Sequence, residues 1–197
     1  LVNQSGEILG VVEAINKNDG TFTDYDRTQL KSLTSYVAMF IENALLFDEQ
    51  NRQFKSLLEV LAASIDAKDT LTAGHSKKVA EYAVGIGRDL GFSEEAIDVL
   101  NVAALLHDYG KLGIDDHVLK KPGKLTPEEF EHIKLHVVNT RNILSKMVFM
   151  RKYRSVPLLA SAHHERLDGS GYTEGLSDVQ IPFMARILAV ADVFEAM

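Results

Sequence analysis

A long stretch without helix-breaking residues constrains the fold most. No glycine or proline occurs between Gly20 and Gly74, and Thr23 followed by Asp26 marks a helix start at which the threonine hydroxyl caps a free backbone amide. Glycine and proline are the residues that most disfavour a helix interior. The sequence therefore predicts one very long helix over about residues 24–66.

Apolar side chains repeat at heptad spacing along this helix. The two interleaved series are Leu30, Val37, Ala44, Asn51, Leu58 and Ile65, and Leu33, Phe40, Phe47, Phe54 and Leu61. The one polar member, Asn51, occupies an a position, where a buried amide commonly fixes register and strand number. The pattern indicates a parallel homodimer through this helix. Alternatively, its first half packs on a sheet of its own chain and its second half packs on the following domain.

The flanking segments predict a small β element before the helix and a helical body after it. Residues 8–15 are apolar and β-branched, follow Gly6 and precede a turn, which is typical of one strand. Beyond residue 67, capping residues and prolines mark several shorter helices, with loops at 111–125 and 166–181. We therefore expect a mainly α protein.

Composition excludes several classes of protein and of site. The chain has no cysteine, so any metal must be held by histidine and carboxylate. Its 21 Lys and Arg against 28 Asp and Glu argue against binding to polymeric nucleic acid. No apolar run approaches the ~20 residues that span a bilayer. The expected location is the cytoplasm.

The histidines are concentrated in apolar helical surroundings. Five of the seven lie in or at the end of predicted helices: His75, His107, His136, His163 and His164. A single histidine of this kind is usually an ordinary core or surface group, but burying several imidazoles without partners is costly. A shared cation would satisfy all of them.

Adjacent candidate ligands indicate two ions rather than one. Neighbouring residues on a helix point ~100° apart, so His107 and Asp108 do not readily bind the same ion, and Asp108 is expected to bridge two. The pair His163 and His164 suggests the same arrangement; the alternative is a surface histidine pair. Asp192 lies among apolar residues, where a carboxylate needs a partner or an ion.

Two divalent ions would leave this pocket positive and attractive to phosphate. Lys111, four residues after His107, is within reach and suits a phosphate oxygen, although a solvated surface lysine is the commoner case. Paired metals polarise a phosphoryl group and activate water, and the chain has no Walker A loop. Phosphoester hydrolysis is the predicted reaction class.

Five motifs resemble the HD-GYP subgroup of the HD phosphohydrolase superfamily over about residues 60–197. They are Ala73-Gly74-His75-Ser76, the run from Leu106 to Gly113, the run from Lys121 to Leu125, the run from His163 to Tyr172, and Ala189-Val190-Ala191-Asp192. The resemblance implies an HD-type helical bundle around two or three ions, usually iron or manganese. It also implies hydrolysis of cyclic di-GMP or a related cyclic dinucleotide.

Carried over by motif, the resemblance assigns roles to individual residues. It implies Lys111 as a contact to the substrate phosphate or the attacking hydroxide, and Tyr172 as a wall of the substrate pocket. The expected cofactors are two divalent transition-metal ions, iron or manganese, although these donors also suit zinc. The implied ligands, with Asp108 bridging, are His75, His107, Asp108, His136, His163, His164 and Asp192.

The first ~50 residues resemble the end of a GAF domain, through 10–16, 20–23 and 41–44. The resemblance implies a sensory module that signals through a dimeric helix, with further signalling proteins as partners. We expect a GAF-like part at 1–48, a linker helix at 49–66, and an HD-GYP domain at 67–197 that is truncated at its C-terminus.

Three departures from the family pattern leave alternatives open. The name-giving Gly-Tyr-Pro is Gly171-Tyr172-Thr173, Leu71 replaces a carboxylate found in members with a third metal, and the given sequence ends before the family's usual basic segment after Asp192. The chain could instead be a catalytically weak or inactive member that serves as a cyclic dinucleotide sensor or as an adaptor for other proteins. A third alternative is hydrolysis of a different nucleotide.

Overall fold

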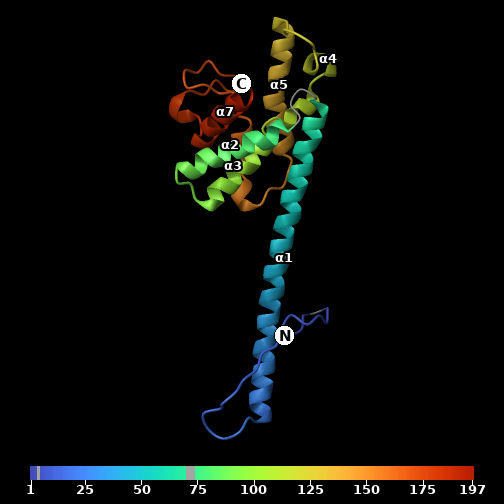
Figure 1. The fold of residues 1–197 in the computed structure, drawn as a ribbon, viewed down its shortest axis with the longest axis vertical. Coiled ribbons are helices and arrows are strands. Elements are labelled where there is room, and N and C mark those ends of the chain that lie inside the picture. The colour runs from blue at the N-terminus through green and yellow to red at the C-terminus, as the bar shows by residue number, and fades with distance from the viewer. Residues whose placement is uncertain (4, 70–73) are drawn as a thin grey trace. The chain divides into compact units, whose positions relative to one another are not determined.

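The computed structural model describes residues 1–3, 5–69 and 74–197, so the departure noted at Leu71 lies outside the described residues. The chain divides into two compact units, 1–56 and 57–197. The elements, in chain order, are α1 (Asp24–Lys68), α2 (His75–Asp89), α3 (Glu94–Leu106), the 3₁₀ helix η1 (Tyr109–Gly113), α4 (Asp116–Leu119), α5 (Pro127–Leu144), η2 (Arg151–Tyr153), α6 (Val156–Ala160), η3 (Asp178–Gln180) and α7 (Phe183–Glu195) (Figure 1). The predicted mainly α fold is confirmed.

The long helix expected from the glycine- and proline-free stretch is α1. Its start is capped reciprocally: the backbone N–H of Asp26 donates to Thr23 Oγ1 over 3.3 Å, and that of Thr23 donates to Asp26 Oδ2 over 2.8 Å. Both bonds satisfy donors at the helix start. Among the described residues, no helix is long and apolar enough to cross a membrane, and the cytoplasmic location stays a prediction.

The strand expected over 8–15 does not form. Within the described residues of the first unit, the β pairing consists of an isolated antiparallel bridge between Val2 and Ile8. Backbone bonds to Leu1 hold only the start of the segment, at Leu9 and Gly10. Val11 and Ile15 are largely exposed, so among the described residues no layer covers these side chains. The relation of residues 1–48 to a GAF domain remains a prediction.

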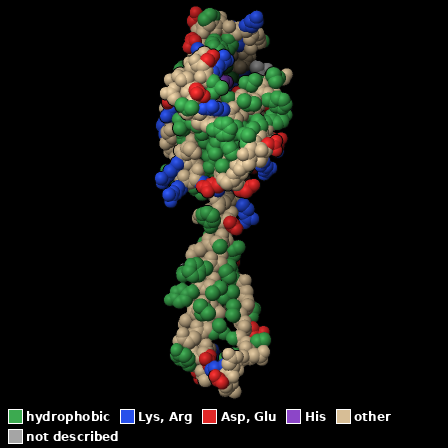
Figure 2. Space-filling model, turned by 90° about the vertical axis from the view of Figure 1, so that its left-hand side faces the viewer, with side chains coloured by type: hydrophobic (Ala, Val, Ile, Leu, Met, Phe, Trp, Pro, Cys, Tyr) green, Lys and Arg blue, Asp and Glu red, His purple; other side chains and the backbone are tan. Residues whose placement is uncertain are grey.

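The side chains of the heptad seam of α1 are exposed in its first half and buried near its end. Leu33, Phe40 and Phe47 are 60%, 68% and 59% exposed, and Figure 2 shows hydrophobic side chains standing out along this helix. Leu58 and Ile65, in the second unit, are only 1% and 2% exposed. The second half of the seam therefore packs in the helical body, as one interpretation held, whereas the first half packs on no sheet among the described residues.

The second unit is a bundle in which α2 contacts α3 and α7, and α6 contacts α3 and α5. The expected caps are present: Ser93 accepts a bond from the N–H of Ala96, and Thr126 forms a capping box with Glu129. Gly91 ends α2 with φ +75°. The predicted loop at 111–125 contains part of η1 and the short helix α4, so it is more ordered than expected.

A close approach of backbones joins the end of α3 to α5. A Cβ atom on Gly110 would lie 1.9 Å from the carbonyl oxygen of His136 and 2.3 Å from the backbone nitrogen of Thr140. The buried Thr140 hydroxyl accepts a bond from the N–H of Gly110 (2.8 Å) and donates to the carbonyl of His107 (3.0 Å). This junction fixes His107 and His136 beside each other.

Candidate metal centre

The structure brings all seven predicted ligands to one region of the bundle. His75 is the first residue of α2, His107 and Asp108 directly follow α3, His136 lies in α5, and Asp192 lies in α7. His163 and His164 follow α6, which ends at Ala160, so they lie in a turn and not in the helix expected for them.

The candidate ligand atoms form two groups of three, linked by a third group. Within each group the atoms lie within 4.8 Å of one another, close enough to share an ion. The groups are His75, His107 and Asp192; His136, His163 and His164; and the linking set His107, Asp108 and His163.

Asp108 lies between the two main groups and turns one oxygen toward each. Its Oδ2 atom is 3.4 Å from His107 Nε2 and 3.8 Å from His75 Nε2. Its Oδ1 atom is 3.3 Å from His136 Nε2 and 3.8 Å from His163 Nε2. A carboxylate placed in this way is suited to bridge two cations.

The expectation that His107 and Asp108 point toward different ions is only partly right. Asp108 does face both groups, but its Oδ2 atom is also close enough to His107 Nε2 to share an ion with it. His107 keeps helical backbone angles, φ −57° and ψ −37°, and Asp108 has φ −96° and ψ 6°. The helical rotation concerns the directions of the Cβ atoms, and it does not fix where the ends of the two side chains lie.

The histidine rings are oriented in a way that fits a bound cation. In His107, His136 and His163, Nδ1 lies 2.7 Å from the carbonyl oxygen three residues earlier, which directs Nε2 inward. Within the described part of the chain, these three Nε2 atoms are buried and have no hydrogen-bond partner. An unsatisfied buried polar atom costs ~1–3 kcal/mol, so the donor set fits the metal that the sequence predicted.

Burial and neighbouring charges shift the pKa values of these groups in opposite directions. Burial, together with adjacent imidazoles, lowers the pKa of His163 well below its usual range and that of His164 to about 4, so both rings are neutral donors at neutral pH. Burial opposes a charge on His107 too, but Asp108 and Asp192 raise its pKa to about 10. Carboxylates that hold a proton on His107 would also hold a cation in its place.

Lys111 is held at the edge of the centre by two carboxylates. Its Nζ atom lies 2.8 Å from Asp69 Oδ2 and 2.8 Å from Asp108 Oδ2. Burial opposes its charge, but the two carboxylates raise its pKa above the usual range, so it remains an ammonium. The alternative prediction for Lys111, a solvated surface lysine, is wrong, because the side chain is only 14% exposed.

Tyr172 covers the second histidine group. Its ring stacks on His164 with centroids 4.8 Å apart and an interplanar angle of 28°, and Lys134 Nζ lies 5.5 Å from the Tyr172 centroid. Thr173, at the proline position of the family motif, has φ +127°. Proline is locked near −65°, so this loop has a conformation that the family's usual residue could not adopt.

The sequence interpretation missed four residues that support these side chains. Asp69 holds Lys111, Thr140 joins the backbones of two ligand-bearing segments, and Glu195 contacts His75. Glu165 is buried, and its carboxylate accepts the N–H groups of Glu174 and Leu176 in the loop after the histidine pair. Two of them carried a signal in the sequence, since Glu165 adjoins the pair and Glu195 follows Asp192 by about one helical turn.

Comparisons with known proteins agree with the geometry. A family model described as HD domain matches residues 59–197. The 3'3'-cGAMP-specific phosphodiesterase 3 of Vibrio cholerae serotype O1 is 43% identical over 133 residues, 68% of this chain and 28% of that protein. The cyclic di-GMP phosphodiesterase of Thermotoga maritima is 38% identical over 183 residues, 89% of this chain and 48% of that protein. The chain thus spans less than half the length of these relatives.

A solved structure shares the helical fold. The HDG"Y"P protein from Bdellovibrio bacteriovorus superposes with a TM-score of 0.50 over 60% of this chain and 38% of that chain. Its sequence is 24% identical, so this likeness concerns the fold alone.

Proposed function

Because the chain belongs to the HD domain family, in its HD-GYP subgroup, we propose that it is a metal-dependent phosphodiesterase acting on cyclic di-GMP or a related cyclic dinucleotide. One observation carries the proposal: two groups of histidine and carboxylate donors converge, with the buried carboxylate of Asp108 between them. Relatives named as phosphodiesterases of cyclic di-GMP and of 3'3'-cGAMP support the substrate class.

We assign two ions to the centre, held by the seven predicted ligands and bridged by Asp108. When bound, two divalent ions supply Lewis acidity toward a phosphoryl oxygen and activate water as a nucleophile. Imidazole and carboxylate donors suit iron and manganese, which are the metals we propose.

Lys111 and Tyr172 are the residues we propose for contact with the substrate. An ammonium has three N–H donors; two of those of Lys111 meet Asp69 and Asp108, and among the described residues the third has no protein partner. We assign it to a phosphate oxygen or to the attacking hydroxide. Tyr172, whose pKa burial raises, stays a phenol, and we place its ring at the wall of the dinucleotide pocket.

Metal removal tests the proposed function. We expect protein purified without chelator to contain about two iron or manganese ions per chain by elemental analysis. Dialysis against a chelator should abolish the release of linear dinucleotide from cyclic di-GMP, and added Mn²⁺ should restore it. Calcium, which prefers oxygen ligands, is the control. Full hydrolysis by protein shown to be metal-free would contradict the proposal.

The loop at Thr173 favours a second candidate, a weak or inactive member that binds the dinucleotide as a sensor or adaptor. The backbone of this loop, which carries Tyr172, differs from any that the family's proline could adopt. Metal-loaded protein that binds cyclic di-GMP without converting it would support the sensor. A panel of other nucleotides in the same assay tests the remaining alternative, hydrolysis of a different substrate.

The last turn of α1 supports regulation through this helix. Lys68 Nζ donates to the carbonyl oxygens of Lys111, Leu112 and Ile114 over 3.1, 2.9 and 2.9 Å. Asp66 accepts bonds from the Ser76 hydroxyl and from the Gly74 N–H, at the start of the helix that carries His75. The end of α1 therefore contacts the start of the helix that carries His75 and the segment that follows His107 and Asp108.

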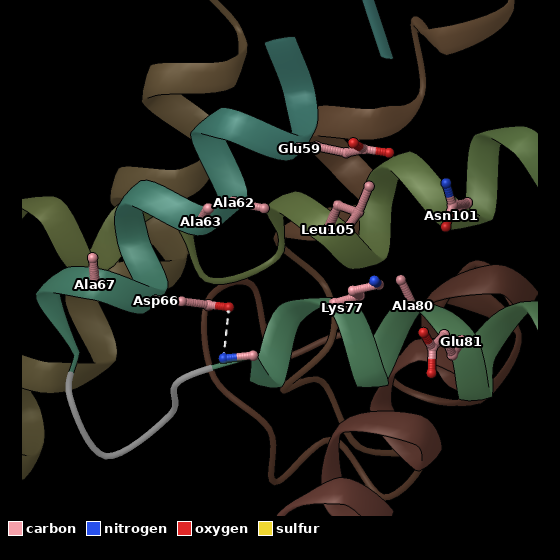
Figure 3. Close-up of a pocket in the computed structure, with 11 residues that line it drawn as sticks. Glu59, Ala62, Ala63, Asp66, Ala67, Lys77, Ala80, Glu81, Asn101 and Leu105 are labelled. Atoms are coloured by element: carbon pink, nitrogen blue, oxygen red, sulfur yellow. Dashed lines mark hydrogen bonds between the residues drawn. The ribbon is translucent and has the colours of Figure 1, made fainter. Parts of the chain in front are cut away.

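Beside these contacts, α1, α2 and α3 line a cavity of about 550 Å³ that contains none of the proposed metal ligands (Figure 3). Its walls include Ala62, Ala63 and Lys77, and the bond between Asp66 and the Gly74 N–H lies at one end. In the proposal, residues 1–48 are a GAF-like sensory part, 49–66 are the linker and 67–197 are the phosphodiesterase domain. The open space beside the end of α1 leaves room for this helix to move when the proposed sensory part receives a signal.

We also propose a parallel homodimer through the exposed half of the heptad seam. Besides the exposed seam residues, Asn51 supports it: among the described residues its Oδ1 atom is buried without a hydrogen-bond partner, and an a-position amide finds its partner in the second helix. In this proposal, signalling proteins are further partners of this helix.

A charge placed in the seam should separate the dimer. We expect Phe40→Glu to raise the dimer dissociation constant at least about 100-fold, because two carboxylates would be buried in an apolar interface. Sedimentation velocity measures the change. Leu45→Glu is the matched control, since Leu45 is 56% exposed and lies off the seam on the same helix. Equal dissociation by both variants, or a monomeric parent protein, would contradict the proposed interface.

A further inference from the structure

The four histidines whose Nε2 atoms approach Asp108 do not all have their rings held in the same way. In His107, His136 and His163, Nδ1 contacts the backbone carbonyl three residues earlier. A hydrogen bond at one ring nitrogen fixes the tautomer and leaves the other nitrogen free as a ligand. These three rings are therefore oriented by their own segments of backbone.

His75 is held by a side chain from another helix. It is the first residue of α2, and its Nδ1 lies 2.5 Å from Glu195 Oε2, while its Nε2 lies 3.2 Å from Asp192 Oδ1. Glu195 is the last residue of α7 and its side chain is 13% exposed. Its other oxygen accepts a bond from Lys78 Nζ over 3.0 Å, so both carboxylate oxygens are engaged.

We propose that Glu195 is a positioning residue, which orients His75 toward the ion shared with His107 and Asp192. A carboxylate that accepts the Nδ1–H of a ligating histidine fixes the ring and strengthens its Nε2 as a donor. α7 would then serve this half of the centre twice, with Asp192 as a ligand and Glu195 as the support of a ligand one turn later. The inference rests on the proposed metal centre and deepens it.

Titration of the metal-free full chain with Mn²⁺ tests this role. The parent protein should bind two ions, and Glu195→Ala should weaken one of them by about 10–100-fold while leaving the other unchanged. Glu195→Gln, which keeps an acceptor oxygen without the charge, should recover part of the loss. His75→Ala identifies the affected site, because it should weaken the same ion.

Two further measurements separate positioning from general stability. Lys78→Met removes a partner of Glu195 without removing the contact to His75, and it should leave both Mn²⁺ affinities within a few-fold of the parent. The melting temperature of the metal-free protein should be similar for the parent and Glu195→Gln. Equal weakening of both ions by Glu195→Ala would indicate a structural role and overturn the inference.

The outcomes also distinguish this inference from the proposed function. If the parent and Glu195→Ala bind two ions with the same affinities, Glu195 does not position a ligand and the inference alone fails. If the parent protein binds no Mn²⁺ and no iron, the proposed metal centre fails and the inference falls with it.

Discussion

Replacing Asp108 by asparagine is expected to lower the hydrolysis of cyclic di-GMP by at least about 10³-fold. The substitution keeps the size of the side chain but removes its charge. The two oxygens of Asp108 face the two groups of candidate ligands, one oxygen toward each, and Lys111 Nζ lies 2.8 Å from Oδ2. Asparagine offers a single weak oxygen donor, so it cannot bridge two cations.

The loss should be visible in metal content as well as in rate. We expect elemental analysis of Asp108→Asn to find at most about one ion per chain, because neither group then retains its shared carboxylate. Asp89→Asn is the matched control, since it makes the same chemical change on the exposed face of α2 and should leave both measurements unchanged. A variant with two ions and parental turnover would show that Asp108 is not the bridge.

The sequence allowed the convergence of the seven candidate ligands to be predicted better than their detailed geometry. All seven residues meet in one region because the bundle brings together the start of α2, the segments that follow α3 and α6, and residues within α5 and α7. The distance of 3.4 Å between Asp108 Oδ2 and His107 Nε2 is not predictable from helical rotation, which gives the directions of the Cβ atoms and not where the ends of the side chains lie.

Supporting residues were harder to find because their partners are distant in sequence. Thr140 bonds to Gly110, and Asp69 bonds to Lys111, through contacts that exist only after the helices have packed. The strand at 8–15 failed for a related reason: β-branched residues favour a strand only where a neighbouring strand pairs with them. Helix signals are local, and for that reason the long helix and its cap were predicted correctly.

The second large effect is expected at Gly110. Its Cβ would fall 1.9 Å from the His136 carbonyl oxygen, and backbone atoms cannot move aside as the end of a flexible side chain can. We expect Gly110→Ala to lower the free energy of unfolding by about 3 kcal/mol or more, which is at the upper end for overpacking. Denaturant unfolding followed by circular dichroism measures this change.

Gly85→Ala provides the matched control for this prediction. Gly85 lies in α2, and a Cβ atom there would meet nothing within 4 Å. Because alanine is the better helix former, this variant should gain ~0.5–1 kcal/mol. If the two variants unfold at the same denaturant concentration, the close approach of η1 to α5 does not exist in solution. His107 and His136 would then lack the junction that holds them beside each other, and a site built on their convergence would need another support.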